Sequence, residues 1–96
     1  MNTPESRTGG EAASLIEYPC LFPIKIMGRR VDAFAEEIVA VVLRHAPDFD
    51  PATLEMRASS AGNYLSCTAT IRATSRAQLD ALYRELTGHP LVKVVL

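Results

Sequence analysis

The chain of 96 residues is poor in several features that mark specialised classes of protein. It contains no tryptophan, two cysteines and 6% aromatic residues, and its formal net charge is −1. A nearly balanced charge excludes the strongly basic footprint of a general nucleic-acid binder. No stretch approaches the ~20 apolar residues that span a bilayer, and the N-terminus lacks the apolar core of a secretory signal. We therefore expect a cytoplasmic protein with two free thiols and with no membrane or nucleic-acid partner.

The apolar content that is present suffices for one small hydrophobic core. Hydrophobic residues make up 48% of the chain and charged residues 22%, a balance typical of globular proteins. Residues 1–14 differ from the rest, because they are rich in Pro, Ser, Thr, Gly and charges of both signs. We predict a disordered tail over residues 1–14 and a single domain over residues 15–96.

Alternation of apolar and polar side chains predicts four strands. The pattern is typical of strands with one buried face, and it runs through residues 21–28, 53–59, 64–73 and 91–96. Gly62 and Asn63 between the second and third segments indicate a hairpin connection. The side chains predicted to face the core are Phe22, Ile24, Ile26, Leu54, Met56, Leu65, Cys67, Ala69, Ile71, Val92 and Val94.

Helical spacing of apolar residues predicts two amphipathic helices, one over residues 30–45 and one that begins after Ser75 and ends at Gly88. Ser75 and Gln78 have the spacing of a capping box, in which the Gln78 side chain reaches back to the cap residue. The element order is therefore βαββαβ. Right-handed crossovers place both helices on one face of a four-stranded antiparallel sheet with strand order 4-1-3-2. This α+β arrangement is a ferredoxin-like sandwich.

Six separated segments resemble, in the same order, the YbeD-like family of small bacterial proteins, also called DUF493 or UPF0250. The segments read YPC (18–20), FPIKIMG (22–28), RHAP (44–47), SSAGNY (59–64), LYREL (82–86) and VKVVL (92–96). The resemblance covers residues 15–96 and implies a ferredoxin-like fold similar to the ACT-type regulatory domains. It also implies a cytoplasmic bacterial protein of unknown function, with no agreed catalytic residues. ACT domains bind amino acids near the first strand–helix junction, and Gly28 occupies the corresponding place here.

The junction after the first strand is one candidate site. Gly28, Arg29 and Arg30 precede a predicted helix N-terminus. Backbone N–H groups, the helix dipole and two guanidinium groups suit a phosphate or a carboxylate. The alternative is a solvated pair of arginines beside a turn glycine, and the sequence leaves both interpretations open.

The open face of the predicted sheet is a second candidate site. Its predicted residues are Lys25, Met27, Arg57, Thr68, Thr70, Arg72 and Lys93. The helices carry most of the acidic residues, namely Asp32, Glu36, Glu37, Asp80 and Glu85. Such a basic face steers acidic partners or small anions. The alternative is an ordinary solvated face of an antiparallel sheet.

Other chemistries lack the residues that they require. An RNA-recognition module carries several aromatic residues on the open face of its central strands, whereas only Tyr64 lies there by alternation. A soft-metal carrier presents Cys-x-x-Cys after its first strand, where this chain has Met27-Gly28-Arg29-Arg30. Cys67 falls on the core side, and neither His45 nor His89 has a nucleophile nearby in the sequence. We predict no catalytic residue, no metal and no cofactor.

The sequence favours a non-enzymatic regulatory or interaction domain. It would bind a partner protein or a small anionic metabolite through the open face or through the junction at Gly28. Self-association into a homodimer, through a sheet edge or the open face, is compatible with this. The alternative is a small enzyme that acts on a phosphate or carboxylate substrate near Arg29 and Arg30.

Overall fold

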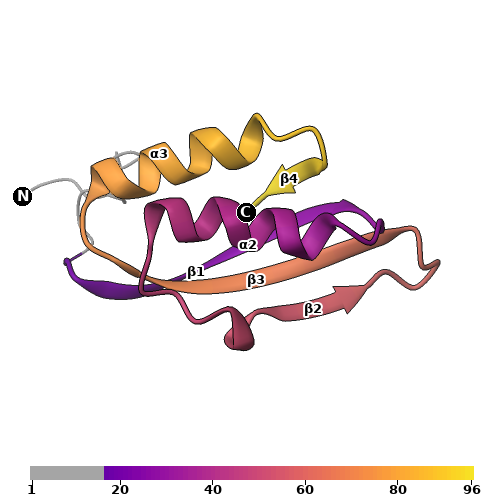
Figure 1. Ribbon diagram of the computed structural model, residues 1–96, viewed down its shortest axis with the longest axis horizontal. Coiled ribbons are helices and arrows are strands. Elements are labelled where there is room, and N and C mark those ends of the chain that lie inside the picture. The colour runs from indigo at the N-terminus through magenta and orange to yellow at the C-terminus, as the bar shows by residue number, and fades with distance from the viewer. Residues whose placement is uncertain (1–16) are drawn as a thin grey trace, which may run out of the picture.

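A computed structural model describes residues 17–96 of the chain, so the predicted tail over residues 1–14 lies outside the described residues. The elements are β1 (Cys20–Arg29), α2 (Phe34–His45), the 3-10 helix η2 (Pro51–Thr53), β2 (Glu55–Ala58), β3 (Tyr64–Ala73), α3 (Arg76–Thr87) and β4 (Val92–Val95). The strands form one antiparallel sheet in the order β2-β3-β1-β4, with both helices on one side (Figure 1). The predicted ferredoxin-like fold is confirmed.

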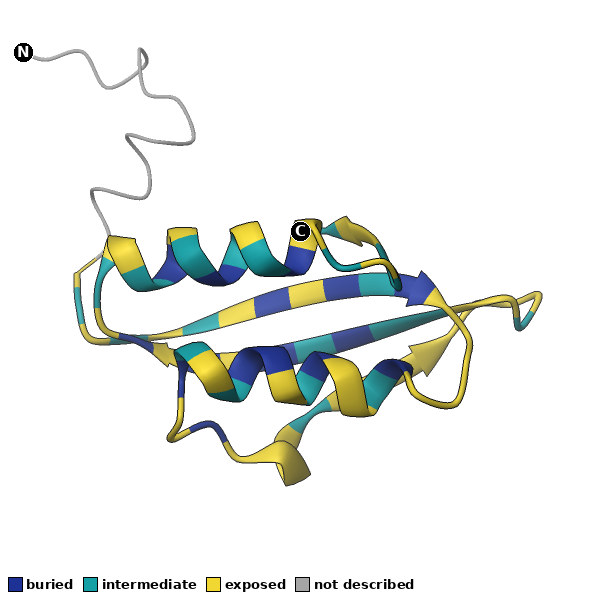
Figure 2. Cartoon of the chain, turned by 45° about the horizontal axis from the view of Figure 1, so that its top comes forward, coloured by how far each residue is buried: buried dark blue, intermediate teal, exposed yellow. Residues whose placement is uncertain are grey.

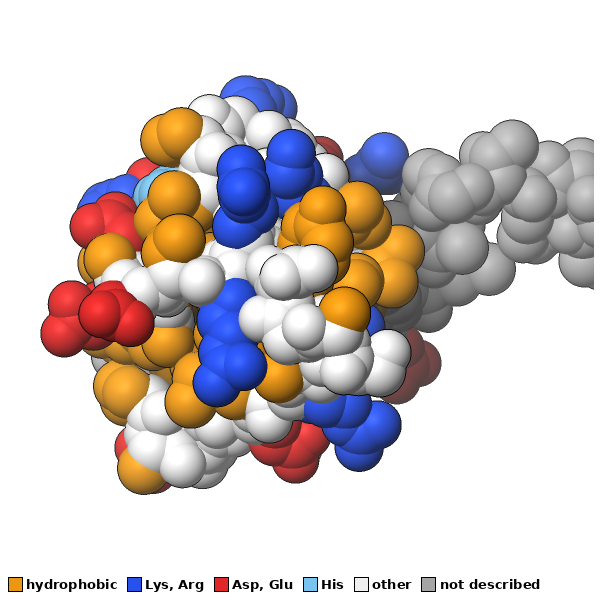
Figure 3. Space-filling view, turned by 90° about the vertical axis from the view of Figure 1, so that its right-hand side faces the viewer, with side chains coloured by type: hydrophobic (Ala, Val, Ile, Leu, Met, Phe, Trp, Pro, Cys, Tyr) orange, Lys and Arg blue, Asp and Glu red, His pale blue; other side chains and the backbone are white. Residues whose placement is uncertain are grey.

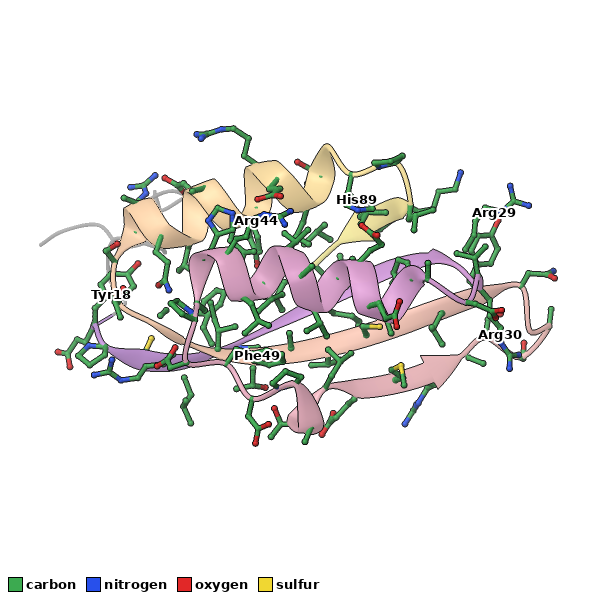
Figure 4. The ribbon with its side chains drawn as sticks, viewed as in Figure 1. Tyr18, Arg29, Arg30, Arg44, Phe49 and His89 are labelled. Carbon is green, nitrogen blue, oxygen red and sulfur yellow. The ribbon has the colours of Figure 1, made fainter. Side chains whose placement is uncertain are left out.

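The core lies between the sheet and the two helices, whose buried sides face the strands (Figure 2). The alternation in β1 and β3 is as predicted, because Ile24, Ile26, Cys67, Ala69 and Ile71 are all buried. The helices contribute a buried stripe made of Phe34, Ile38, Val41, Val42, Leu79, Leu82 and Leu86. Phe49, predicted only as part of a turn, is also buried in this core (labelled in Figure 4).

The first helix begins four residues later than predicted. Strand β1 continues to Arg29, and the backbone N–H of Arg30 donates to the carbonyl of Asn63 at 3.0 Å. The chain is therefore still held by the hairpin at Arg30. A turn follows, closed by the bond from the Phe34 N–H to the Val31 carbonyl, before α2 starts at Phe34.

The alternation predicted for the last strand is wrong from Val94 onward. Ile26 pairs with Val95 and Met27 pairs with Val94, but Gly28 pairs with Val92, so the register shifts between Met27 and Gly28. Lys93 is the extra residue at this irregularity. Val94 is consequently 44% exposed beside Met27, whereas Val95 packs against the core. A β-bulge inverts the facing of every residue that follows it.

Strand β2 is shorter and more exposed than predicted. Asp50 accepts a hydrogen bond from the Ala52 N–H at 3.0 Å and starts η2, so β2 begins only at Glu55. Met56 pairs with Cys67 and lies on the helix side of the sheet, as predicted, but it is 58% exposed. The predicted core position of Met56 is wrong because β2 is the edge strand of the sheet.

The predicted capping box is confirmed in one of its two bonds. The Ser75 Oγ accepts from the Gln78 N–H at 3.0 Å. The Gln78 Oε1, however, accepts from the N–H of Thr74 at 2.7 Å rather than from that of Ser75. The Gln78 Nε2 donates to the His45 carbonyl at 2.8 Å, which joins the start of α3 to the end of α2.

Candidate functional site

The sheet register brings most residues of the predicted open face together. Lys25 is level with Thr68 of β3, and Met27 with Ser66, which in turn is level with Arg57 of β2. Further along the same face, Thr70 is level with Pro23, and Arg72 with Leu21. Lys93 is the exception, because it lies at the irregularity of β4, where alternation no longer assigns it to this face.

The open face also carries residues that the sequence interpretation assigned elsewhere. Arg29 pairs with Tyr64 at the end of β1 and so belongs to this face rather than to a loop. The backbones of Lys25 and Leu96 exchange hydrogen bonds of 3.2 and 2.8 Å, which places Leu96 beside Lys25. Only the shift in β4 turns Val94 and Leu96 toward the open face, and no signal in the sequence indicates that shift.

Charge on this face is strongly one-sided. Four basic residues, Lys25, Arg29, Arg57 and Arg72, stand against one acidic residue, Glu55. Within residues 17–96, none of these five side chains has an ion-pair partner. Their charges are therefore available to an external group.

Exposed apolar side chains lie between these charges. Leu21 is 74% exposed, Leu96 65%, Tyr64 45% and Val94 44%. A hollow of about 260 Å³ lies between Met27, Tyr64 and Leu96, with Lys25 and Arg57 at its rim. A second, more polar hollow of about 410 Å³ lies between Lys25, Glu55, Arg57 and Thr68. The face therefore offers shallow mixed hollows rather than a deep pocket.

The end of the molecule near the β2–β3 hairpin has the same mixed character. Figure 3 shows Lys and Arg side chains in the middle of this end with hydrophobic side chains beside them, while acidic side chains lie toward the margins. A hollow of about 560 Å³ here is lined by Arg29, Arg30, Val31 and the hairpin residues Gly62, Asn63 and Tyr64. The basic, apolar surface thus continues from the sheet onto the hairpin.

The three residues of the predicted anion site are separated by the fold. Gly28 is a buried strand residue, where an added Cβ would lie 2.2 Å from the Leu91 carbonyl oxygen and 2.4 Å from Phe34 Cε1. Arg29 and Arg30 extend to opposite sides of the end of β1 (Figure 4). The chain alternates here, so the two side chains leave the strand in different directions, although both line the hollow beside the hairpin. Anion binding at this junction stays a prediction.

The helix side of the molecule is less acidic than predicted, because bases are interleaved with the acids. Glu85 of α3 is bound by Arg44 and by the His45 Nε2, the latter at 2.7 Å. His89 Nε2 lies 3.2 Å from Glu37, and Arg76 lies 3.7 Å from Asp80. The pairs of Glu85 connect α2 to α3, the pair of His89 with Glu37 connects α2 to the turn before β4, and the pair of Arg76 with Asp80 lies within α3.

A further hollow, of about 850 Å³, lies where α2 ends and α3 begins. Within residues 17–96, most of its polar lining groups, although not Asp48, already bind one another or their neighbours. Arg44 and His45 are engaged by Glu85, and Gln78 bridges the His45 carbonyl and the Thr74 N–H. This hollow is consequently a structural junction between the helices rather than a candidate site.

Removing the carboxylate of Glu85 is expected to destabilise the protein in a pH-dependent way. The hydrogen bonds from Arg44 and His45 lower the pKa of Glu85 from 4.5 to about 2. A depressed folded-state pKa stabilises the fold above pH 4.5, and this contribution is lost as the pH falls toward 2. Because Glu85 is about one-third exposed, we expect Glu85→Gln to lower the free energy of unfolding by about 1 kcal/mol at pH 7. Urea denaturation measures this, and a difference that persisted at pH 2 would contradict the assignment.

Both cysteines are free thiols, as predicted. Cys67 is buried, and this burial raises the pKa of its thiol.

In residues 17–96 no three His, Cys, Asp or Glu side chains gather as a metal site. None of the helices in the same range is long and apolar enough to cross a membrane.

Solved structures of low sequence identity share the fold of this chain. The solution structure of protein HP0495 from H. pylori matches with a TM-score of 0.69 at 16% identity, and covers 100% of this chain and 94% of the other. The ACT domain from the GTP pyrophosphokinase of Chlorobium tepidum matches with a TM-score of 0.62 at 21% identity, and covers 80% of this chain and 83% of that domain. These likenesses confirm the ACT-like form of the sandwich.

Relatives of much higher identity are named as UPF0250 proteins. That of Leptothrix cholodnii is 63% identical over 83 residues, and that of Bordetella pertussis is 60% identical over 83 residues. Each alignment covers 86% of this chain and 91% of the relative. A family model described as a protein of unknown function (DUF493) matches residues 13–96. The chain therefore belongs to the DUF493 family of bacterial UPF0250 proteins, as the six sequence segments predicted.

Proposed function

We propose that this protein is a non-catalytic interaction domain that binds an acidic segment of a partner protein on the open face of its sheet. The observation that carries the proposal is the set of four basic side chains without ion pairs among residues 17–96, interspersed with exposed apolar side chains. Complementary charge steers and orients a partner, while apolar and aromatic contacts supply much of the affinity.

The extent of this surface favours a protein segment over a small metabolite. Strands β1 and β3 pair over ten residues, from Cys20 and Ala73 at one end to Arg29 and Tyr64 at the other. Ten strand residues span about 33 Å, far more than a phosphate or an amino acid contacts. Tyr, Met and Arg, the residue types enriched in the buried centres of interfaces, all occur here as Tyr64, Met27 and Arg57.

Reversing two charges on the open face is expected to abolish partner binding. A photo-crosslinking residue at exposed Thr70 lies level with Pro23, between the positions of Lys25 and Arg72 along the strands. In the native cell it should form covalent adducts with a small number of proteins. The double substitution Lys25→Glu and Arg72→Glu should reduce these adducts at least about tenfold, because it replaces attraction by repulsion. Mass spectrometry of the adducts identifies the partner.

A matched control reverses two charges on the helix side. Arg76→Glu together with Arg84→Glu makes the same change in net charge on exposed residues of α3, and should leave the adducts at Thr70 unchanged. Both double variants should retain the amide spectrum of the folded protein. Adducts that survive Lys25→Glu and Arg72→Glu, or that decrease equally in the control, would contradict binding on the open face.

A further inference from the structure

The outer edge of β2 has backbone groups with no partner in residues 17–96. The Ser59 N–H donates to the Tyr64 carbonyl at 2.9 Å, so the polar groups of Ser59 point toward β3. In an antiparallel pair, every second residue points its N–H and C=O to the same side. Arg57 and Glu55 therefore also bond toward β3, while Met56 and Ala58 direct their N–H and C=O groups outward, where no strand follows.

The side chains of β2 are also suited to contact a further strand. Glu55 and Arg57 lie on the open face, and within the described chain neither has an ion-pair partner. Met56 lies between them in sequence, points to the opposite face, and is 58% exposed. Edge strands are commonly protected by charges that repel an incoming strand, but here the two charges have opposite signs.

We propose that β2 pairs with β2 of a second copy of this chain, antiparallel and with Met56 opposite Met56 at a two-fold axis. This register puts Glu55 of each copy opposite Arg57 of the other, which gives two cross-strand ion pairs on the open face. Opposite charges directly across a strand pair are stabilising and like charges are destabilising. A parallel arrangement would put like charges opposite each other, so the charge order Glu55–Met56–Arg57 selects the antiparallel dimer.

The backbone groups agree with this register. Each Met56 would donate its N–H to the carbonyl of the other Met56, and each Ala58 would donate to the carbonyl of Leu54 in the second copy. The N–H of Leu54 is already used, because it donates to the Pro51 carbonyl at 3.2 Å. The register does not need that N–H, since its four backbone bonds come from Met56 and Ala58. The two exposed Met56 side chains would meet on the helix side.

The dimer would join the two sheets into one sheet of eight strands with a continuous open face. A contact through a four-residue strand buries less than the ~1,200 Å² of a standard interface. We therefore expect a weak dimer with a dissociation constant of about 10–100 µM. The dimer would engage Arg57, which is also one of the four basic residues of the open face. Partner binding is therefore tested through Lys25 and Arg72, which lie outside β2, so that the failure of one proposal is distinguishable from the failure of the other.

Charge exchange within β2 tests the register directly, by sedimentation equilibrium from about 10 µM to 1 mM protein. Glu55→Arg alone places Arg opposite Arg, and Arg57→Glu alone places Glu opposite Glu. Each variant should weaken self-association at least about tenfold. An equimolar mixture of the two variants should form the dimer again, since each strand then meets its complement. The double variant with both substitutions should self-associate like the wild type.

Arg84→Glu is the matched control, because it makes the same change as Arg57→Glu at an exposed position of α3, and it should leave the dimer unchanged. Hydrogen exchange at the Met56 and Ala58 amides should slow as the protein concentration rises. A wild-type protein that stays monomeric at 1 mM overturns the proposal. So does a dimer that the single variants leave intact, or single variants that fail to associate when mixed.

Discussion

Replacing Gly28 by alanine is expected to destabilise the protein by about 3 kcal/mol, because the core has no space for one methyl group at this position. The added Cβ would lie 2.2 Å from the Leu91 carbonyl oxygen and 2.4 Å from Phe34 Cε1. The first of these is a backbone atom, so rotation of a side chain cannot relieve the contact. Equilibrium unfolding in urea, followed by far-UV circular dichroism, measures the loss.

Gly88→Ala is the control for this substitution. A Cβ at Gly88 would come no closer than 3.4 Å to another atom, and the φ of −89° suits any residue. Its effect should stay within about 0.5 kcal/mol. Equal stability of Gly28→Ala and the wild type would show that β4 moves away from β1 at little cost. The close packing of Leu91 and Phe34 against Gly28 is by itself a sufficient reason for a glycine at this position, so no bound ligand is needed to explain it.

Phe34→Ala is expected to cost about 3–5 kcal/mol, the range for removal of a fully buried aromatic side chain. Phe34 is completely buried at the first residue of α2 and faces Gly28 of β1. The substitution leaves a cavity at the point where the first helix meets the sheet. The same urea titration measures the change in the free energy of unfolding.

Leu21→Ala provides the comparison for Phe34, because Leu21 is apolar but 74% exposed. Its truncation should change stability by no more than about 0.5 kcal/mol. Comparable losses in the two variants would mean that the packing of Phe34 contributes little beyond that of a surface residue. Leu21 lies on the open face, so Leu21→Ala also gives a stable variant for partner-binding measurements.

The central strands and both helices could be predicted because their patterns are long. In β3 the alternation runs over ten residues, and in α3 the apolar residues recur at helical spacing. Patterns of this length determine which side chains are buried. Strand β4 could not be predicted in the same way, since it has only four residues, three of them valine. When neighbouring residues are equally apolar, the bulge opposite Met27 and Gly28 decides which valine faces the core, and tertiary pairing sets that bulge.

The residues of the open face could be predicted from the sequence wherever apolar and polar side chains alternate regularly along a strand. Lys25, Met27, Arg57, Thr68, Thr70 and Arg72 take their facing from β1, β2 and β3, whose register follows the predicted alternation. Arg29 was assigned to a loop because the sequence marks Gly28 as a strand end, although the glycine serves close packing within the strand. The exposure of Met56 depends on the position of β2 at the sheet edge, which is a property of the whole sheet.

The central position of β1 has a consequence for how the chain folds. Ile26 pairs with Cys67 and with Val95, which follow it by 41 and 69 positions. The β2–β3 hairpin and the two helices need only local contacts, whereas β1 gains its neighbours by closing long loops. Closure of long loops slows folding, because chain entropy is lost before the contacts form. We therefore expect early formation of the hairpin and α3, with the capture of β1 and β4 as the late step.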